Sequence, residues 1–301
     1  MTGSRPTPRR MTGLVAALVA IAIWAGWIPV LRLGVTGHVR PEDVAAVRYG
    51  IAGILLAPVL VLHFREVPWR RPWLLLVLMA GAGVPYQFLF GTGVKVASSG
   101  QAAVLGPGVV SALTALAAVL VLGERLKRAQ LAGLAVTLAG VAVVLLHGAA
   151  RAQLPGLLMI VAASALWALY TTASRALALR PLLNAALVAC GNALLYLPAF
   201  VANGGAAHLA AIPPAELWLQ SIYQGVLAAV VALVAFVIAV ERLGATAASS
   251  FTPLTPVLAT LIGWLLLGDR VDAATALGLA AVAAGVLIAN RATLAALIAR
   301  R

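Results

Sequence analysis

The feature that most constrains this chain is a series of apolar runs, each long enough to cross the roughly 30 Å hydrocarbon core of a bilayer as a helix. Short polar segments separate them. The runs fall at about residues 12–33, 43–63, 73–93, 98–121, 129–146, 155–177, 183–202, 217–239, 246–266 and 273–291. They are continuous and lack the ten-residue alternation of barrel strands. We therefore expect an all-α polytopic membrane protein with ten transmembrane helices.

The composition supports this class and excludes others. The chain is 63% hydrophobic and 10% charged, whereas soluble domains are roughly half apolar and a quarter charged. Its net charge of +13 does not indicate nucleic-acid binding, because the basic residues fall in short clusters between apolar runs rather than along one face. A single cysteine, Cys190, excludes an intrachain disulfide and a multi-cysteine metal site. We expect no cofactor and no metal.

The distribution of Lys and Arg predicts the orientation, because cytoplasmic loops retain positive charge. If the N-terminus is inside, the inner segments hold fourteen of these residues and the outer segments four, and three lie within spans. We therefore expect both terminal tails, 1–11 and 293–301, in the cytoplasm, most simply at a bacterial inner membrane. Membrane lipid is an expected partner. The oligomeric state is left open, with a monomer slightly favoured.

One stretch of the sequence occurs twice. Residues 121–141, "VLGERLKRAQLAGLAVTLAGV", match residues 266–286, "LLGDRVDAATALGLAAVAAGV", at a spacing of 145, with ten of 21 positions identical. A tryptophan and an arginine eight residues apart recur at a spacing of 143, as Trp24 with Arg32 and Trp167 with Arg175. Shared glycines and a shared Gly-acid-Arg turn are hard to obtain by chance, so we interpret the match as a duplication.

The duplication divides the chain into residues 12–150 and 151–292, each with five spans. Because five is odd, the second half must enter the membrane in the opposite sense to the first. Such inverted repeats enclose a central site and exchange conformations around it, which is the architecture of alternating access. We therefore expect two inverted five-helix repeats around a central cavity.

Two segments carry a resemblance to a known family: "PGVVSALTALAAVLVLGERL" (107–126) and "PLTPVLATLIGWLLLGDRV" (253–271). Each is a Pro-containing helix that ends in a Gly-acid-Arg turn. The sequence resembles the EamA-type, ten-helix branch of the drug/metabolite transporter superfamily over residues 12–292. It departs at Ser111, which matches Pro256, and at Asp269, which replaces the usual Glu. The resemblance implies a basket of helices and export of small metabolites, with amino-acid exporters, including those for aromatic amino acids, looking closest.

Aromatic and uncharged polar residues within the spans are candidates for substrate binding. Trp24 and Trp167 lie near the centres of their spans, away from the interfacial belt where tryptophan is common, so they are either cavity walls or packing between helices. Phenols and amides meet the charges of a zwitterion without adding net charge; for the hydroxyl groups, backbone bonding is the alternative. The candidates are Trp24, Tyr86, Gln87, Trp167, Tyr170, Tyr223, Gln224, Ser249 and Ser250.

Three arginines within spans are candidates for gating or anchoring. In an inverted repeat, Arg32 lies near the outer end of the first span and Arg175 near the inner end of the sixth, so both can reach water or a salt bridge. We favour anchoring over gating for this pair. Arg48 lies further inside its span and either holds a substrate carboxylate or pairs with Glu42 or Asp43; we favour the pair.

Prolines and glycines within spans mark hinges and close contacts. Proline removes a helical hydrogen bond and frees a carbonyl, so the candidate hinges, which are equally compatible with static kinks, are Pro29, Pro85, Pro107, Pro253 and Pro256. Glycines that repeat at seven in the fifth and tenth spans predict close packing of these two helices. They are Gly133, Gly140, Gly278 and Gly285.

The distribution of titratable residues limits the function. All eight acidic residues and all four histidines lie in predicted loops or at span ends. Proton-coupled exchange of cations uses a carboxylate within the membrane, and intramembrane enzymes need an Asp pair, a Ser/His dyad or a metal cluster, so neither is expected. Glu124 and Asp269, at the two Gly-acid-Arg turns, we expect to pair with a neighbouring Arg.

We therefore expect a carrier that exports small net-neutral metabolites, most simply amino acids, by alternating access. A multidrug or nucleotide-sugar carrier is the alternative within carriers. Neither substrate is well matched, because a cationic drug calls for an embedded carboxylate and a nucleotide sugar for several cavity arginines or lysines. A receptor or scaffold is the alternative outside carriers, and the predicted loops, none above about 15 residues, leave it little surface.

Overall fold

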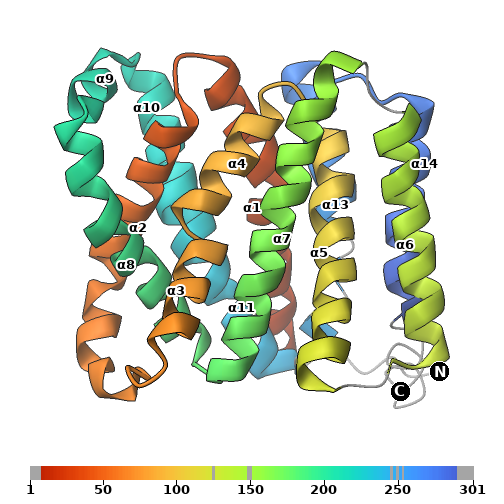
Figure 1. Ribbon diagram of the computed structural model, residues 1–301, viewed down its shortest axis with the longest axis horizontal. Helices are drawn as coiled ribbons and strands as arrows, with labels where there is room; N and C mark the ends of the chain where they lie inside the picture. The colour runs from red at the N-terminus through yellow and green to blue at the C-terminus, as the bar shows by residue number, and fades with distance from the viewer. Residues whose placement is uncertain are drawn as a thin grey trace.

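The computed structural model describes residues 8–123, 126–147, 151–244, 247–248, 251–252 and 254–289. Over these residues it is a helical bundle without strands (Figure 1). The helices are α1 (Pro8–Thr36), α2 (Pro41–Leu62), α3 (Pro72–Gly81), α4 (Val84–Val94), α5 (Ser99–Leu122), α6 (Arg128–His147), α7 (Leu154–Leu177), α8 (Pro181–Ala202), α9 (Gly205–Ala211), α10 (Pro214–Gln220), α11 (Ala232–Leu243), α13 (Leu254–Leu267) and α14 (Ala273–Ala289). Two 3-10 turns, η1 (Phe64–Glu66) and η2 (Arg151–Gln153), and a π-helical segment, η3 (Ser221–Val231), lie between them.

Eight helical stretches of the described chain are long and apolar enough to cross a bilayer, with α3 and α4 counted as one stretch and α10, η3 and α11 as another. Two further apolar helices, α13 and α14, are shorter. The expected all-helical, polytopic architecture is confirmed. That α13 and α14 also cross, which would make ten spans, stays a prediction.

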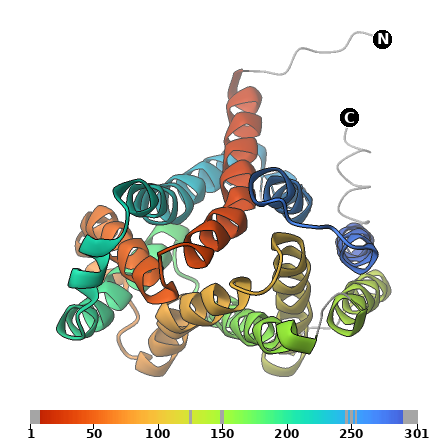
Figure 2. The same cartoon turned by 90° about the horizontal axis from the view of Figure 1, so that it is seen from above.

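The long helices run between two edges of the bundle (Figure 1). The α1–α2, α4–α5, α8–α9 and α13–α14 connections lie at the upper edge, and the α2–α3 and α7–α8 connections lie at the lower edge, where α5 ends and α6 begins. Seen from above, α2 and α8 pack together at one end of the bundle and α6 and α14 at the other (Figure 2). Between them α1 packs against α11 and α13, and α7 packs against α3, α4 and α5.

The third apolar run is broken in the middle. α3 ends at Gly81 and α4 begins at Val84, because Pro85 has no N–H to continue the hydrogen-bond ladder. Asn192 of α8 fills the break: its Nδ2 donates to the Met79 carbonyl at 3.0 Å and its Oδ1 accepts from the Val84 N–H at 2.9 Å. The side-chain amide thus replaces the backbone bonds that the membrane interior otherwise leaves unsatisfied.

The glycine repeat has the role that its spacing predicts. A Cβ at Gly140 of α6 would lie 2.9 Å from the Gly278 carbonyl of α14, and a Cβ at Gly285 would lie 2.5 Å from the Gly133 carbonyl. Both distances are too short for a side chain. The absence of side chains at these positions therefore lets the backbones of α6 and α14 touch along what we call the glycine seam.

The hydrophobic core is continuous near the upper edge and divided near the lower edge. The largest cluster joins the upper parts of α1, α2, α4, α5, α6, α7, α13 and α14. Towards the lower edge, one cluster lies on α2, α3, α7 and α8 and another on α1, α11 and Ala248, and within the described chain they share no member. α5 reflects this change, since residues 99–109 are buried except Pro107, whereas most of residues 110–120 are half-buried or exposed.

Candidate functional site

Five aromatic rings follow one another through the interior of the bundle. Trp27 of α1 lies 4.9 Å from Phe90 and 6.2 Å from Tyr86, both of α4, between ring centroids. Tyr86 lies 4.9 Å from Trp167 of α7, which lies 5.1 Å from Tyr170. We call these five residues the ring series. These separations are typical of favourable aromatic pairs.

The helical period places these rings. Tyr86 and Phe90 are four residues apart on α4, and Trp167 and Tyr170 are three apart on α7, so each pair shares one face of its helix. Tyr86 and Phe90 are buried, whereas Trp27, Trp167 and Tyr170 are only partly buried. The indole Nε1 of Trp27 is buried without a hydrogen-bond partner among the described residues. The ring series therefore offers apolar surface together with the buried indole N–H of Trp27.

A line of polar side chains lies beside the ring series. Arg48 of α2 donates from Nη1 to Gln224 Oε1 at 3.2 Å, and its guanidinium lies over the Trp27 ring, 5.8 Å from the centroid. Gln224 Nε2 donates to Gln220 Oε1 at 3.4 Å, and Gln220 Nε2 donates to the Val30 carbonyl at 2.6 Å. We call Arg48, Gln224 and Gln220 the polar line. It connects α2 to α1 through α10 and η3.

Glycines on α1 make room for this arrangement. A Cβ at Gly34 would lie 2.6 Å from Gln220 Nε2, and one at Gly26 would collide with the Tyr223 hydroxyl. Tyr223 itself donates to the Ile23 carbonyl at 2.9 Å, so its hydroxyl joins η3 to α1. Tyr223 and Gln224 both lie in the π-helical segment, a rare geometry that often occurs at functional sites.

Gln87 is the second unusual polar residue. Its side chain on α4 is fully buried, and neither its Oε1 nor its Nε2 has a hydrogen-bond partner among the described residues. An unpaired buried amide is costly, because desolvation is not repaid by new hydrogen bonds. Its chain neighbour, Tyr86, belongs to the ring series. Gln87 is thus a buried amide of α4 with unused hydrogen-bonding capacity.

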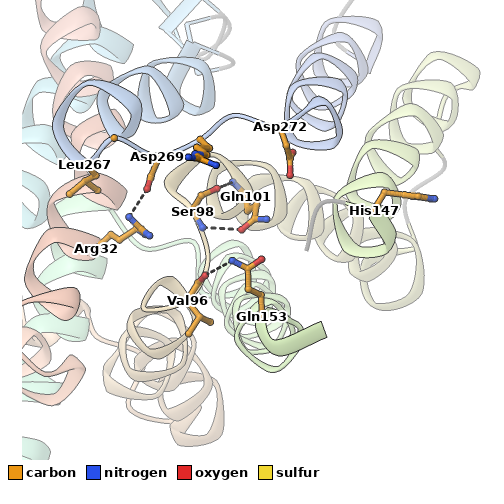
Figure 3. A pocket seen from close by; sticks show the side chains of 11 residues that line it. Arg32, Val96, Ser98, Gln101, His147, Gln153, Leu267, Asp269 and Asp272 are labelled. Atoms are coloured by element: carbon orange, nitrogen blue, oxygen red, sulfur yellow. Dashed lines mark hydrogen bonds and ion pairs between the residues drawn. The ribbon is translucent and has the colours of Figure 1, made fainter. Parts of the chain in front are cut away.

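An ion pair lies at the upper edge. Arg32 of α1 donates from Nη1 to Asp269 Oδ1 at 2.5 Å (Figure 3). Its Nε donates to the Ala97 carbonyl at 2.7 Å. Asp269 also accepts from the Ser99 N–H at 2.8 Å. The pair, which we call the upper ion pair, connects α1, the start of α5 and the α13–α14 loop beside an open pocket of about 670 Å³. Arg32 thus forms a salt bridge in this conformation, and whether the bridge anchors or gates stays a prediction.

Two predictions of ion-pair partners are wrong. Arg48 does not pair with Glu42 or Asp43, because Asp43 is held by Arg40 at 3.0 Å, and Arg48 contacts Gln224 and Trp27 instead. Asp269 does not pair with its neighbour Arg270 but with an arginine 237 residues away in the chain.

The remaining residues predicted from the sequence do not gather at one site. Trp24 packs against Phe236 of α11 with 5.2 Å between centroids, so the residue of α1 that meets the ring series is Trp27. Arg175 is exposed in the last turn of α7. Pro29 and Pro107 lie inside α1 and α5, and Pro256 lies in the first turn of α13. Ser249, Ser250, Pro253 and Glu124 lie outside the described residues.

Sequence reasoning missed Trp27, Phe90 and Gln220. A signal for Trp27 was present, because it lies 143 residues before Tyr170, the same spacing that relates Trp24 to Trp167. Gln220 lies four residues before Gln224, a spacing at which two amides on one helix face can bond. Phe90 offered no signal beyond its spacing from Tyr86.

Comparison with known proteins identifies the family. The model of the EamA-like transporter family matches the chain twice, over residues 11–146 and 154–291. The chain belongs to the EamA-like transporter family. This membership makes it a multi-pass membrane protein and a transporter, and it agrees with the resemblance seen in the two Gly-acid-Arg segments.

This EamA-like transporter is similar to two further proteins. A probable terminal-alkyne amino-acid exporter of Streptantibioticus cattleyicolor (strain ATCC 35852) is 28% identical over 298 residues, covering 93% of each chain. A solved structure titled only "Crystal structure of protein" aligns with a TM-score of 0.60 and 22% identity, covering 94% of this chain and 98% of that one. The second similarity concerns the fold alone.

Proposed function

We propose that this EamA-like transporter exports small net-neutral amino acids, aromatic ones included, across a bacterial inner membrane. The observation that carries the proposal is the position of the ring series and the polar line, which lie inside a bundle whose core is continuous at one edge and divided at the other. Aromatic rings, amides and a single arginine suit a solute with a carboxylate, an ammonium and an apolar side chain. The similarity to a probable amino-acid exporter adds support.

The mechanism in this proposal is alternating access between two inverted halves, residues 12–150 and 151–292. Three observations support the inversion: the family model matches once in each half, α1 and α7 have corresponding neighbours, and the Gly-acid-Arg turn occurs in both. In this scheme the upper edge, where the core is continuous, is the outer one, and the lower edge, where the core is divided, faces the cytoplasm.

The upper ion pair serves as the outer gate in this scheme. It holds α1 to the α13–α14 loop directly above the region where the core is continuous. Arg175 occupies the position of Arg32 in the second half, and it is exposed at the lower edge in this conformation. Its counterpart acid by sequence, Glu124, lies outside the described residues. Opening at one edge then accompanies closure at the other.

Proton exchange through a central acid is not part of the proposal. In the sequence every Asp, Glu and His lies at or near the end of an apolar run. Asp43 lies in the first turn of α2 and Asp269 in the α13–α14 loop, so both are at the upper edge rather than in the middle of the bundle. Downhill or weakly coupled movement of a net-neutral solute fits this distribution.

The test is uptake of labelled amino acids into proteoliposomes, with and without a pH gradient. The panel contains phenylalanine, leucine, propargylglycine as a terminal-alkyne amino acid, and glutamate and lysine as charged controls. We expect uptake of the neutral compounds at similar rates in both conditions. No uptake of any amino acid contradicts the proposed substrate, and uptake only with the gradient contradicts the proposed lack of proton coupling. Protein-free liposomes give the background.

A further inference from the structure

We infer that Arg48 binds the carboxylate of the transported solute and that Trp27 and the ring series receive its side chain. The substrate class is then 2-amino acids with a free carboxylate and an apolar or aromatic side chain. This inference rests on the proposed function and narrows it to one anchoring residue.

Arg48 is an arginine inside a span without an acidic partner. It lies seven residues into α2, about 10 Å from the upper end at 1.5 Å per residue. None of the described ion pairs includes it. A charged residue within a membrane span normally pairs with an opposite charge or marks a functional site. The described contacts favour the second role.

The nearest acid along the helix is unavailable. Asp43 is fully buried, and it accepts from the backbone N–H and the side chain of Arg40 at 2.8 to 3.1 Å. His208 Nδ1 lies 3.0 Å from the same carboxylate. Asp43 and Arg48 are five positions apart, which places them about 140° apart around a helix of 3.6 residues per turn. Asp43 therefore faces a different set of neighbours.

The present partners of Arg48 are all neutral. A guanidinium carries five N–H donors; one of them bonds the Oε1 of Gln224 at 3.2 Å, and the Tyr49 phenol is a second hydrogen-bonding neighbour. The Trp27 ring covers one face, and the phenols of Tyr49 and Tyr86 are close enough to interact electrostatically. A carboxylate forms two parallel, charge-assisted bonds with a guanidinium and is a stronger acceptor than an amide. A solute carboxylate would therefore displace Gln224.

The same contacts position the rest of the solute. Trp27 touches the guanidinium on one side and continues into the ring series through Phe90 and Tyr86. A carboxylate on Arg48 thus places the side chain of an amino acid against aromatic surface. The ammonium group, one carbon from the carboxylate, is attracted by the faces of the same rings. Each part of the zwitterion has a complementary neighbour.

The first experiment compares ligands on the unmodified protein. Phenylalanine, phenylalaninamide and phenethylamine share a ring and an ammonium, and only phenylalanine has a carboxylate. We expect the amide and the amine to compete for phenylalanine uptake at least about tenfold less well, a ratio that corresponds to about 1.4 kcal/mol. Equal competition by all three overturns the inference even while amino-acid uptake, and with it the proposed function, stands. Absence of phenylalanine uptake contradicts the proposed function instead.

The second experiment assigns the selectivity to Arg48. We expect R48Q to weaken phenylalanine binding at least about tenfold and to abolish the preference over phenylalaninamide. R48K keeps the charge but loses the two-bond geometry, so we expect an intermediate preference. The control is R65Q, which removes one exposed charge from η1 at the lower edge and should behave as the unmodified protein. A preference that is unchanged in folded R48Q or R48K overturns the assignment.

Discussion

Single residues in this transporter act across long sequence distances. Asp269 holds the Arg32 guanidinium and the Ser99 N–H with its two carboxylate oxygens, so three segments meet on one side chain. The sequence indicated that Arg32 and Asp269 were each unusual but gave no reason to join them. Likewise it identified Arg48 as a charge within a span and predicted the wrong partner, because helix periodicity alone does not show which acid is already occupied.

The upper ion pair is testable by neutralising Asp269. Removing one partner of a buried ion pair costs about 3–5 kcal/mol, so we expect D269N to favour opening of the upper edge. The readout is the rate at which an impermeant maleimide labels a cysteine at Ser99, which is fully buried beneath the pair, in a Cys190→Ser background. We expect the cysteine at position 99 to be labelled from outside faster in the D269N variant than in the same protein with Asp269 intact.

The matched control for this prediction is D272N. Asp272 is an exposed carboxylate of the same loop that caps the Thr275 N–H. Equal labelling in D269N and D272N contradicts a gating role for the upper ion pair.

Local sequence signals predict the helices in most of the chain, but they do not predict the helix geometry at the candidate site. Proline and glycine predicted irregular helices, and Pro85 indeed follows the break between α3 and α4. The filling of that break by Asn192 was not predictable, since the two helices are joined only by tertiary packing. The π-helical geometry of η3 was also unforeseen, because its sequence is an ordinary apolar run with one Tyr-Gln pair.

The close contact of α6 and α14 at the glycine seam can be tested by adding a side chain there. A leucine at Gly140 would force α6 away from Ala281 and Gly278, because even its Cβ would lie 2.7 Å from the Ala281 Cβ. Overpacking costs about 1–3 kcal/mol, so we expect a lower melting temperature for G140L in detergent. The control is A139L, whose side chain is exposed on the outside of the bundle. A melting temperature equal to that of A139L contradicts the seam.

At the scale of the whole molecule, composition and apolar run length correctly predicted an all-helical, polytopic protein, and the repeated turn led to the family. Ten crossings and the inversion of the halves remain predictions. The division of the core near the lower edge could not be read from the sequence, because both halves carry similar apolar faces. Which faces meet depends on the conformation adopted.

The orientation of the molecule is a separate prediction. Fourteen of the Lys and Arg residues lie in segments assigned to the inside, so we expect the lower edge to face the cytoplasm. In a Cys190→Ser background, a cysteine at His38 of the upper edge should react with an impermeant reagent added to intact cells. A cysteine at Arg65 of the lower edge should react only after permeabilisation. The reverse pattern, or labelling of both in intact cells, contradicts the assignment.

The glycine seam also has a consequence for biogenesis. α6 is complete at His147, whereas the helix that covers its glycines begins only at Ala273. During synthesis on the ribosome, α6 is therefore inserted before α14. The backbone at its glycines stays uncovered until the helices from α7 to α14 have been inserted. α14 covers a surface of the first half, so the two halves complete their assembly together.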